Sequence, residues 1–176
     1  MSETTTPAET PEADERKLPA LGEPAPDFEL PASTGKKIKL SKLRGKKVVI
    51  YFYPQDMTPT CTQESCDFRD YNGKLKRAGA VVLGISPDDL KRHGKFIEKY
   101  ELPFPLLADT ELEACKLYGV WTLKKLYGRE YMGVERSTFL IDAEGKLVRE
   151  WRKVKIKDHV NQVLEAVKAL GKTEQA

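Results

Sequence analysis

Cysteine and histidine are scarce in this chain of 176 residues, which has three cysteines and two histidines. The cysteine count is odd and no cysteine spacing repeats, so a framework of structural disulfides is disfavoured. This usage fits a reducing, cytoplasmic setting, where cysteines close together in sequence are more often catalytic or metal-binding than structural. The scarcity therefore directs attention to the few thiols that are present.

Long apolar runs and localisation signals are also missing. No stretch approaches the roughly 20 apolar residues that a membrane-spanning helix needs, so we expect no membrane association. The N-terminal segment MSETTTPAETPEADER lacks the basic start and the apolar stretch of a secretory signal. It is acidic rather than arginine-rich, which disfavours a transit peptide as well.

A concentrated basic face is missing too, although the formal net charge is +3. Residues 1–17 contribute five acidic side chains against Arg16 and Lys17, a net −3, so the remainder carries +6. These positive charges are scattered along the sequence, whereas nucleic-acid binding usually needs a basic face. We therefore expect no nucleic-acid partner.

Composition predicts one folded domain with short extensions. The chain is 40% hydrophobic and 32% charged, which is ordinary for a globular protein of this length. Residues 1–18 are rich in Thr, Pro, Ala and Glu and lack aromatic residues, so we expect a disordered acidic tail. We assign residues 19–171 to the domain and residues 172–176 to a flexible C-terminus.

Hydrophobic periodicity and turn residues predict an alternation of strands and helices. Strands are expected at 36–40, 46–54, 80–86 and 105–109, followed by a β-hairpin at 137–154. Helices are expected at 59–77, 87–100, 111–119 and 157–170, with a loop rich in Lys and Tyr before the hairpin. This order is typical of an α/β protein with a mixed central β-sheet flanked by helices, and it matches a thioredoxin-like fold.

The segment PQDMTPTCTQESCD (54–67) contains two of the three cysteines, Cys61 and Cys66. Thr58 is a favourable N-cap and Pro59 a favourable first helical residue, which places Cys61 in the first turn of a helix. Unpaired backbone N–H groups and the helix dipole favour an anion there, and the thiolate is the nucleophilic form of cysteine. Cys61 is therefore the candidate nucleophile.

A thiolate at this position also needs a cation. A helix end supplies about 1 kcal/mol, whereas lowering the pKa of a thiol from about 8.5 to about 7 takes about 2 kcal/mol. His93 and His159 lie in expected helices far along the chain, and we expect both at the surface. Arg136 precedes the strand STFLID, which could lie beside the strand that ends at Pro54. Since arginine cannot lose its charge, Arg136 is the better candidate.

The spacing of Cys61 and Cys66 has a geometric consequence. In an α-helix the Cα atoms of residues five apart lie about 8.7 Å from each other. A disulfide usually needs Cα atoms within about 7 Å. While both cysteines are helical, a disulfide between them is therefore excluded.

These residues resemble the peroxiredoxin family. PQDMTPTC fits the motif P-x-x-x-T-x-x-C, with Pro54, Thr58 and Cys61 on its fixed positions. The continuation TQESCDFRD is similar to the Q-type peroxiredoxins, also called bacterioferritin comigratory proteins. ERSTFLID resembles the arginine-bearing segment of the family, and the similarity extends over nearly all of the expected domain. One departure is Thr60, where family members commonly have glycine.

The resemblance implies a thiol peroxidase in which Cys61 is the peroxidatic thiolate, attacks hydrogen peroxide or an organic hydroperoxide, and becomes a sulfenic acid. It implies that Cys66 is the resolving thiol and that thioredoxin or a similar dithiol reduces the Cys61–Cys66 disulfide. Thr58 would cap the helix and donate its hydroxyl hydrogen to the peroxide. Arg136 would hold the thiolate and the developing charge, and Pro54 would shield the thiolate from water. The resemblance also implies a monomer that needs no metal or organic cofactor.

Two other classes of protein remain alternatives. A thioredoxin-type disulfide exchanger normally has C-x-x-C, whereas this chain has C-x-x-x-x-C. A zinc-binding or redox-sensing interaction module could use Cys61, Cys66 and a histidine, but no second ligand pair completes such a site. For Cys115 we favour a buried structural thiol. Lys124 and Lys125 are expected only to solvate their loop.

Overall fold

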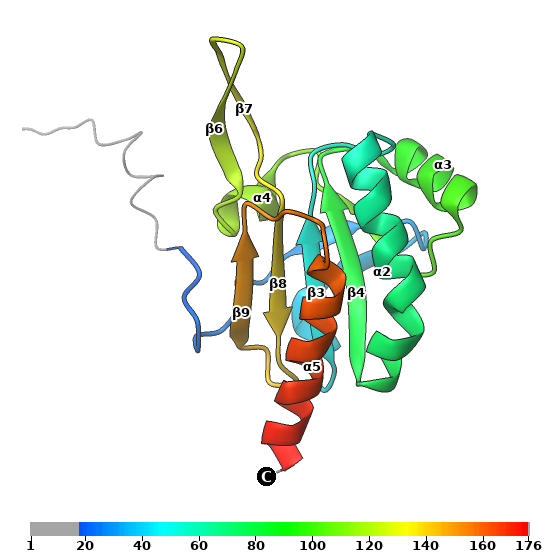
Figure 1. Cartoon of the computed structure of the whole chain (residues 1–176), viewed down its shortest axis with the longest axis vertical. Helices are drawn as coiled ribbons and strands as arrows, with labels where there is room; N and C mark the ends of the chain where they lie inside the picture. Colours follow the sequence, from blue (N-terminus) through cyan, green and yellow to red (C-terminus); the bar gives the residue numbers. More distant parts are fainter. Residues whose placement is uncertain (1–17, 176) are drawn as a thin grey trace, which may run out of the picture.

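A mixed five-stranded sheet lies at the centre of the computed structural model, which describes residues 18–175 (Figure 1). Its strands are β3 (Lys47–Phe52), β4 (Ala80–Ser86), β5 (Leu106–Ala108), β8 (Ser137–Ile141) and β9 (Leu147–Arg152). They follow the order β5-β4-β3-β8-β9. The pairs β3–β4 and β4–β5 are parallel, whereas β3–β8 and β8–β9 are antiparallel. The predicted mixed sheet is therefore confirmed.

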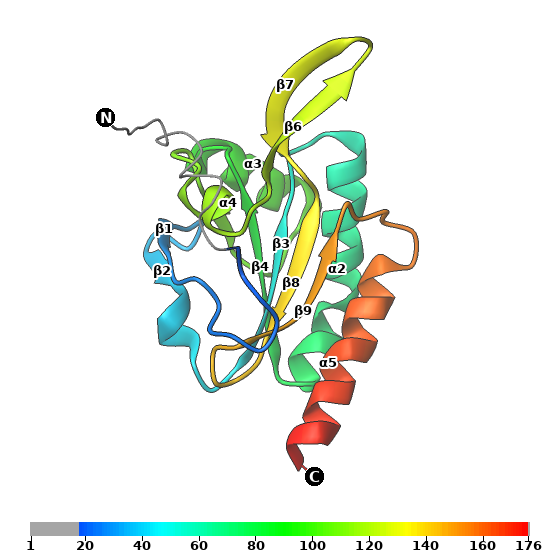
Figure 2. The same cartoon turned by 90° about the vertical axis from the view of Figure 1, so that its left-hand side faces the viewer.

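β3 is the central strand of the sheet, and all six of its residues are buried, as expected for a strand covered on both faces. One face packs against α2 (Pro59–Arg77) and α5 (His159–Gln175), which lie side by side (Figures 1 and 2). Elements on the other face are α4 (Glu113–Leu117), the 3₁₀ helix η2 (Leu40–Leu43), β1 (Glu29–Pro31) and β2 (Lys37–Lys39). α3 (Leu90–Tyr100) lies beside β5.

α2 begins and ends where the sequence predicts. Pro59 is its first residue, and Gly79 follows its end with a φ of 90°, a left-handed conformation that glycine adopts without strain. Cys61 and Cys66 both lie within this continuous helix, and both thiols are free. The two sulfur atoms are therefore carried at helical spacing, as the sequence predicts.

The segment between α4 and β8, expected to be a loop, is a β-hairpin. β6 (Trp121–Leu126) pairs with β7 (Arg129–Val134), and the hairpin projects beyond the sheet (Figures 1 and 2). Tyr127 and Gly128 form its turn with φ values of 53° and 77°, as a two-residue type I′ turn requires. Hydrophobic alternation gives little signal here because the strands are buried only near their base.

The last helix extends beyond its expected end, whereas the expected N-terminal tail lies almost entirely outside the described residues. α5 continues to Gln175, past the end expected at residue 170, because a glycine such as Gly171 weakens a helix by about 1 kcal/mol without having to end it. Residues 1–17, and with them nearly all of the expected acidic tail, lie outside the described residues. Between residues 18 and 175, no helix is long and apolar enough to cross a bilayer.

Candidate active site

The first turn of α2 meets the end of β3 and the residue before β8. Because β3 pairs with β8 and Phe52 lies opposite Ser137, Arg136 comes next to the start of α2. The Nη2 atom of Arg136 lies 3.4 Å from the Sγ atom of Cys61, a residue that is 1% exposed. A permanent positive charge and a helix N-terminus thus converge on one thiol, and both stabilise a thiolate.

Glu64 is a second partner of Arg136 that the sequence analysis missed. Nη1 of Arg136 donates to Oε1 of Glu64 at 2.7 Å, and Glu64 is fully buried. Burial raises the pKa of Glu64 to about 7, although Arg136 acts to lower it. Glu64 thereby fixes the direction of the guanidinium whose other nitrogen faces Cys61. The signal in the sequence is an acidic residue three positions after the cysteine, on the same side of the helix.

Thr58 precedes α2 as predicted, but its hydroxyl group does not cap the helix. Oγ1 of Thr58 donates instead to the carbonyl oxygen of Gln55 at 3.1 Å. The reason is local, since Met57 has a φ of 69° and turns the chain back toward Gln55. The expected side-chain cap is therefore wrong. Because the hydroxyl hydrogen is already engaged, Oγ1 is available to accept a hydrogen bond rather than to donate one.

Comparison with known proteins identifies the family. Residues 21–150 match the AhpC/TSA family. The chain is 54% identical over 151 residues to Peroxiredoxin Bcp of Bacillus subtilis (strain 168), an alignment that covers 86% of this chain and 96% of that protein. The chain belongs to the AhpC/TSA family of peroxiredoxins. Peroxiredoxin Bcp of Escherichia coli (strain K12) is 42% identical over 147 residues, covering 84% of this chain and 94% of that protein.

Solved structures of Q-type peroxiredoxins share the fold. Peroxiredoxin Q of Xanthomonas campestris (Structure F4) has a TM-score of 0.79 and 42% identity, covering 82% of this chain and 91% of that one. The bacterioferritin comigratory protein of Xanthomonas campestris has a TM-score of 0.81 and 39% identity, covering 86% of this chain and 99% of that one. The Q-type peroxiredoxin assignment and the thioredoxin-like fold are therefore confirmed.

Cys66, the second thiol in α2 of this peroxiredoxin, lies in a different environment from Cys61. It is half-buried, and burial raises the pKa of its thiol, while Arg69 lowers that pKa and Asp70 raises it. Cys66 is therefore protonated near neutral pH, whereas the sulfur of Cys61 lies 3.4 Å from Nη2 of Arg136. The same helix thus carries two thiols in different electrostatic environments.

Pro54 lies in the wall of an open hollow of about 520 Å³ that also includes Arg136. Pro54 is exposed, and so is Thr60, the residue where the family commonly has glycine. The hollow is also lined by lysines of the β6–β7 hairpin and of the segment after β9, namely Lys124, Lys125, Lys153 and Lys155. It opens the Arg136 side of the peroxiredoxin site to solvent.

Both histidines are buried, so the expectation of surface positions is wrong. Burial, with a further contribution from Arg136, lowers the pKa of His159 to about 4, and this imidazole is neutral near pH 7. His93 bonds to Asp56. Neither histidine is the cation beside Cys61. In the described part of the chain, no three His, Cys, Asp or Glu side chains gather into a group that could hold a metal ion.

Cys115 is the buried thiol that the sequence predicts. Its pKa is raised by burial and by the nearby Asp109, which also accepts the backbone N–H of Cys115 at 2.8 Å. Cys115 belongs to the core on the opposite face of the sheet from Cys61. It therefore offers a matched control for the two thiols of α2.

Proposed function

We propose that Cys61 is the peroxidatic thiol of this thiol-dependent peroxidase and that hydrogen peroxide and organic hydroperoxides are its substrates. The observation that carries the proposal is the 3.4 Å contact between Nη2 of Arg136 and Sγ of Cys61 in the first turn of α2. The organic substrates are supported by the bacterioferritin comigratory protein of Xanthomonas campestris, whose structure concerns alkyl peroxide reduction activity.

The reduction begins with attack of the Cys61 thiolate on one oxygen of the peroxide. An S–O bond forms as the O–O bond breaks, the departing oxygen takes up a proton as water or alcohol, and Cys61 becomes a sulfenic acid. Arg136 stabilises both the thiolate and the charge that develops on the departing oxygen. Oγ1 of Thr58 accepts a hydrogen bond from the peroxide O–H, and Pro54 shields the thiolate from bulk water.

Cys66 then resolves the sulfenic acid. Its sulfur attacks the sulfur of Cys61, water leaves, and a disulfide forms. In a helix the two Cα atoms are about 8.7 Å apart, beyond the roughly 7 Å that a disulfide usually tolerates. The first turns of α2 therefore unwind before the disulfide closes, which also exposes the disulfide to a reductant.

Thioredoxin or a similar dithiol protein returns the two electrons and restores both thiols by disulfide exchange. The chain acts as a monomer, since both reacting cysteines belong to one helix and no second subunit is needed to complete the pair. A cytoplasmic location fits this cycle because the disulfide must be reduced after every turnover. The cycle needs no metal and no organic cofactor.

Peroxide consumption with thioredoxin, thioredoxin reductase and NADPH tests this function. The wild-type protein and the matched control Cys115→Ser should turn over at similar rates. Cys61→Ser should be inactive because a serine hydroxyl is not ionised near neutral pH. Steady turnover by Cys61→Ser would remove Cys61 from the peroxidatic role.

A further inference from the structure

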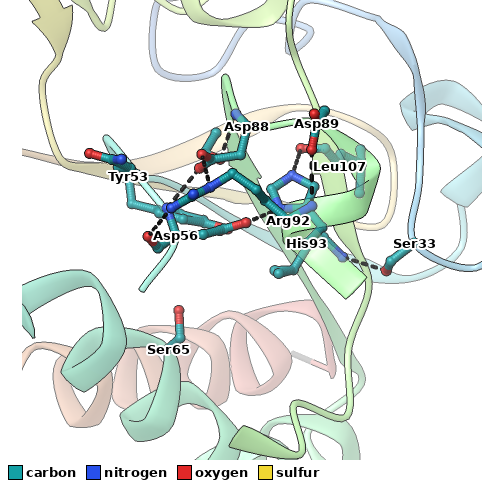
Figure 3. A network of polar contacts seen from close by, with 12 residues as sticks. Ser33, Tyr53, Asp56, Ser65, Asp88, Asp89, Arg92, His93 and Leu107 are labelled. Atoms are coloured by element: carbon teal, nitrogen blue, oxygen red, sulfur yellow. Dashed lines mark hydrogen bonds and ion pairs between the residues drawn. The ribbon is translucent and has the colours of Figure 1, made fainter. Parts of the chain in front are cut away.

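Asp56, two residues before Thr58, is the most firmly held residue of the loop that leads into α2 (Figure 3). It is fully buried, and each of its backbone and side-chain polar atoms has a partner. Its backbone N–H donates to Oδ2 of Asp88 at 2.7 Å, and its carbonyl oxygen accepts from Nη2 of Arg92 at 3.1 Å. Its carboxylate oxygens accept from the hydroxyl of Tyr53 at 2.5 Å and face Nδ1 of His93 at 2.7 Å.

His93 ties this loop to the central sheet. Its Nε2 lies 2.9 Å from the carbonyl oxygen of Leu107 in β5, and a carbonyl can only accept, so Nε2 carries a hydrogen. Its Nδ1 faces a carboxylate oxygen of Asp56, so one proton lies between these two atoms. The imidazole is fully buried, and both of its nitrogen atoms are engaged. It therefore acts as a rigid bridge between the Asp56 loop and β5.

Further hydrogen bonds hold Asp88 and Arg92, the two partners of the Asp56 backbone, in place. Asp88 accepts from Oγ of Ser86 at 2.7 Å and from Nε of Arg92 at 3.1 Å. Asp89 caps α3 by accepting the backbone N–H of Arg92 at 2.9 Å. Figure 3 shows Asp88, from the segment between β4 and α3, and Arg92, from α3, beside Asp56. A loop that is satisfied in this way is expensive to displace, because each broken bond would leave a buried polar group without a partner.

Fewer polar contacts per residue hold the residues that directly follow Asp56. Met57 has a left-handed φ of 69°, which is strained for a side chain of this size. Within residues 18–175, the hydroxyl of Thr62 and Oε2 of Glu64 are buried without a hydrogen-bond partner. The next short side-chain bonds to the sheet come at Glu64, whose Oε1 accepts from Nη1 of Arg136 at 2.7 Å, and at Ser65, whose Oγ lies 2.8 Å from the hydroxyl of Tyr51. The segment between the Asp56 bonds and these two bonds begins directly after Asp56 and contains Cys61.

We propose that the buried Asp56–His93 pair is a positioning anchor for the loop that precedes α2. By fixing this loop, the pair holds Thr58 and the first turn of α2 against Arg136. The same pair is the stationary end from which that turn unwinds. The backbone connects the two, since the carbonyl of Thr58 accepts the helical N–H of Thr62 at 2.8 Å only two residues after Asp56. This inference rests on the proposed function of Cys61. It assigns Asp56 and His93 no contact with the peroxide.

Two isosteric substitutions separate the two bonds of His93. In His93→Gln the amide nitrogen can take the place of Nε2, which keeps the bond to Leu107 and loses the bond to Asp56. In His93→Asn the amide nitrogen can take the place of Nδ1, which keeps the bond to Asp56 and loses the other. Both variants lose one buried hydrogen bond. The loss of unfolding free energy should be larger in His93→Gln, which leaves an oxygen of the Asp56 carboxylate without its partner, than in His93→Asn, which leaves the neutral carbonyl of Leu107 without one.

The rate of Cys61 oxidation by hydrogen peroxide in a single turnover should distinguish the variants. His93→Gln should react about tenfold more slowly or worse, since a displacement of about 1 Å between reacting groups can cost about a hundredfold. His93→Asn should react at nearly the wild-type rate. Hydrogen exchange of the amides of residues 57–62 should be faster in reduced His93→Gln than in reduced His93→Asn. Equal rates of oxidation in the two variants, or equal exchange of the amides of residues 57–62, would overturn the anchor.

Arg92→Ala provides a variant that is expected to fold, because the Arg92 side chain is 45% exposed. It removes the bond to the carbonyl of Asp56 and the bond to Asp88. The rate of Cys61 oxidation and the exchange of residues 57–62 should change in the same direction but less than in His93→Gln, because the bond between His93 and the Asp56 carboxylate remains. An unchanged rate with unchanged exchange would contradict the proposal. The exchange experiment can be repeated in a Cys61→Ser background, where faster exchange in His93→Gln supports the anchor even if Cys61 is not the peroxidatic thiol.

Discussion

Replacing Glu64 with glutamine should stabilise the protein, and only at high pH. Glu64 is fully buried, and its Oε2 has no hydrogen-bond partner among residues 18–175. Its pKa is about 7 in the fold and 4.5 in the unfolded chain, because burial disfavours the charged form. Below pH 4.5 both states carry the proton. As pH rises toward 7 the unfolded chain releases its proton first, so the folded state loses stability.

The size of the effect follows from the two pKa values of Glu64. Above pH 7 the difference between about 7 and 4.5 lowers the free energy of unfolding by about 3 kcal/mol. Glu64→Gln should therefore unfold at higher urea concentration than wild type at about pH 8 and at nearly the same concentration at about pH 4. The neutral amide keeps an oxygen that can accept from Arg136.

Urea unfolding followed by circular dichroism at the two pH values measures this difference. Glu98→Gln serves as the control because Glu98 is exposed and carries the same chemical change. It should alter the unfolding free energy by less than about 0.5 kcal/mol at either pH. Destabilisation by Glu64→Gln at high pH would refute the reasoning, since it would mean that the ionised Glu64–Arg136 pair stabilises the fold more than burial of the carboxylate costs.

Three further predictions concern the same region. Arg136→Ala should slow oxidation by hydrogen peroxide about a hundredfold in stopped-flow measurements. Arg136→Lys should also be slow, because a point charge cannot hold Cys61 and Glu64 at once. A wild-type rate in either variant would assign Arg136 a structural role. Since His159 has a pKa of about 4 in the fold against 6.5 unfolded, stability should fall by up to about 3 kcal/mol as pH drops through that range. His159→Gln should remove most of this acid sensitivity in urea unfolding. Hydrogen exchange of residues 59–66 should be slow in the reduced protein and fast after oxidation, and equal protection in both would exclude unwinding.

The sequence predicts the features that depend on local chemistry. The Thr58–Pro59 pair and Gly79 mark the two ends of α2, and the uniformly apolar β3 marks the centre of the sheet. The approach of Arg136 to Cys61 also follows from the sequence, because only one neighbouring strand had to be placed correctly. Helix signals and a single strand pairing are thus enough to place the guanidinium of Arg136 beside the thiol of Cys61.

Structural features that depend on residues far away in the sequence cannot be predicted from local sequence patterns. The burial of His93 depends on Asp56 and Leu107, which lie 37 and 14 residues away in sequence. The hydroxyl direction of Thr58 depends on the left-handed φ of Met57, a conformation that few non-glycine residues adopt. Hydrophobic alternation does not predict the β6–β7 hairpin, because the hairpin buries little of either face. In each case tertiary structure, not local propensity, decides the outcome.

Mass spectrometry after one equivalent of hydrogen peroxide tests most directly whether Cys61 is the attacking thiol. The wild-type protein should lose two hydrogen atoms and yield a peptide pair joined through Cys61 and Cys66. Cys66→Ser should instead gain one oxygen atom, located on Cys61 as a sulfenic acid that a dimedone probe traps. Oxygen on Cys115 in that variant, or oxidation of Cys61→Ser at the wild-type rate, would contradict the assignment of Cys61 as the peroxidatic cysteine.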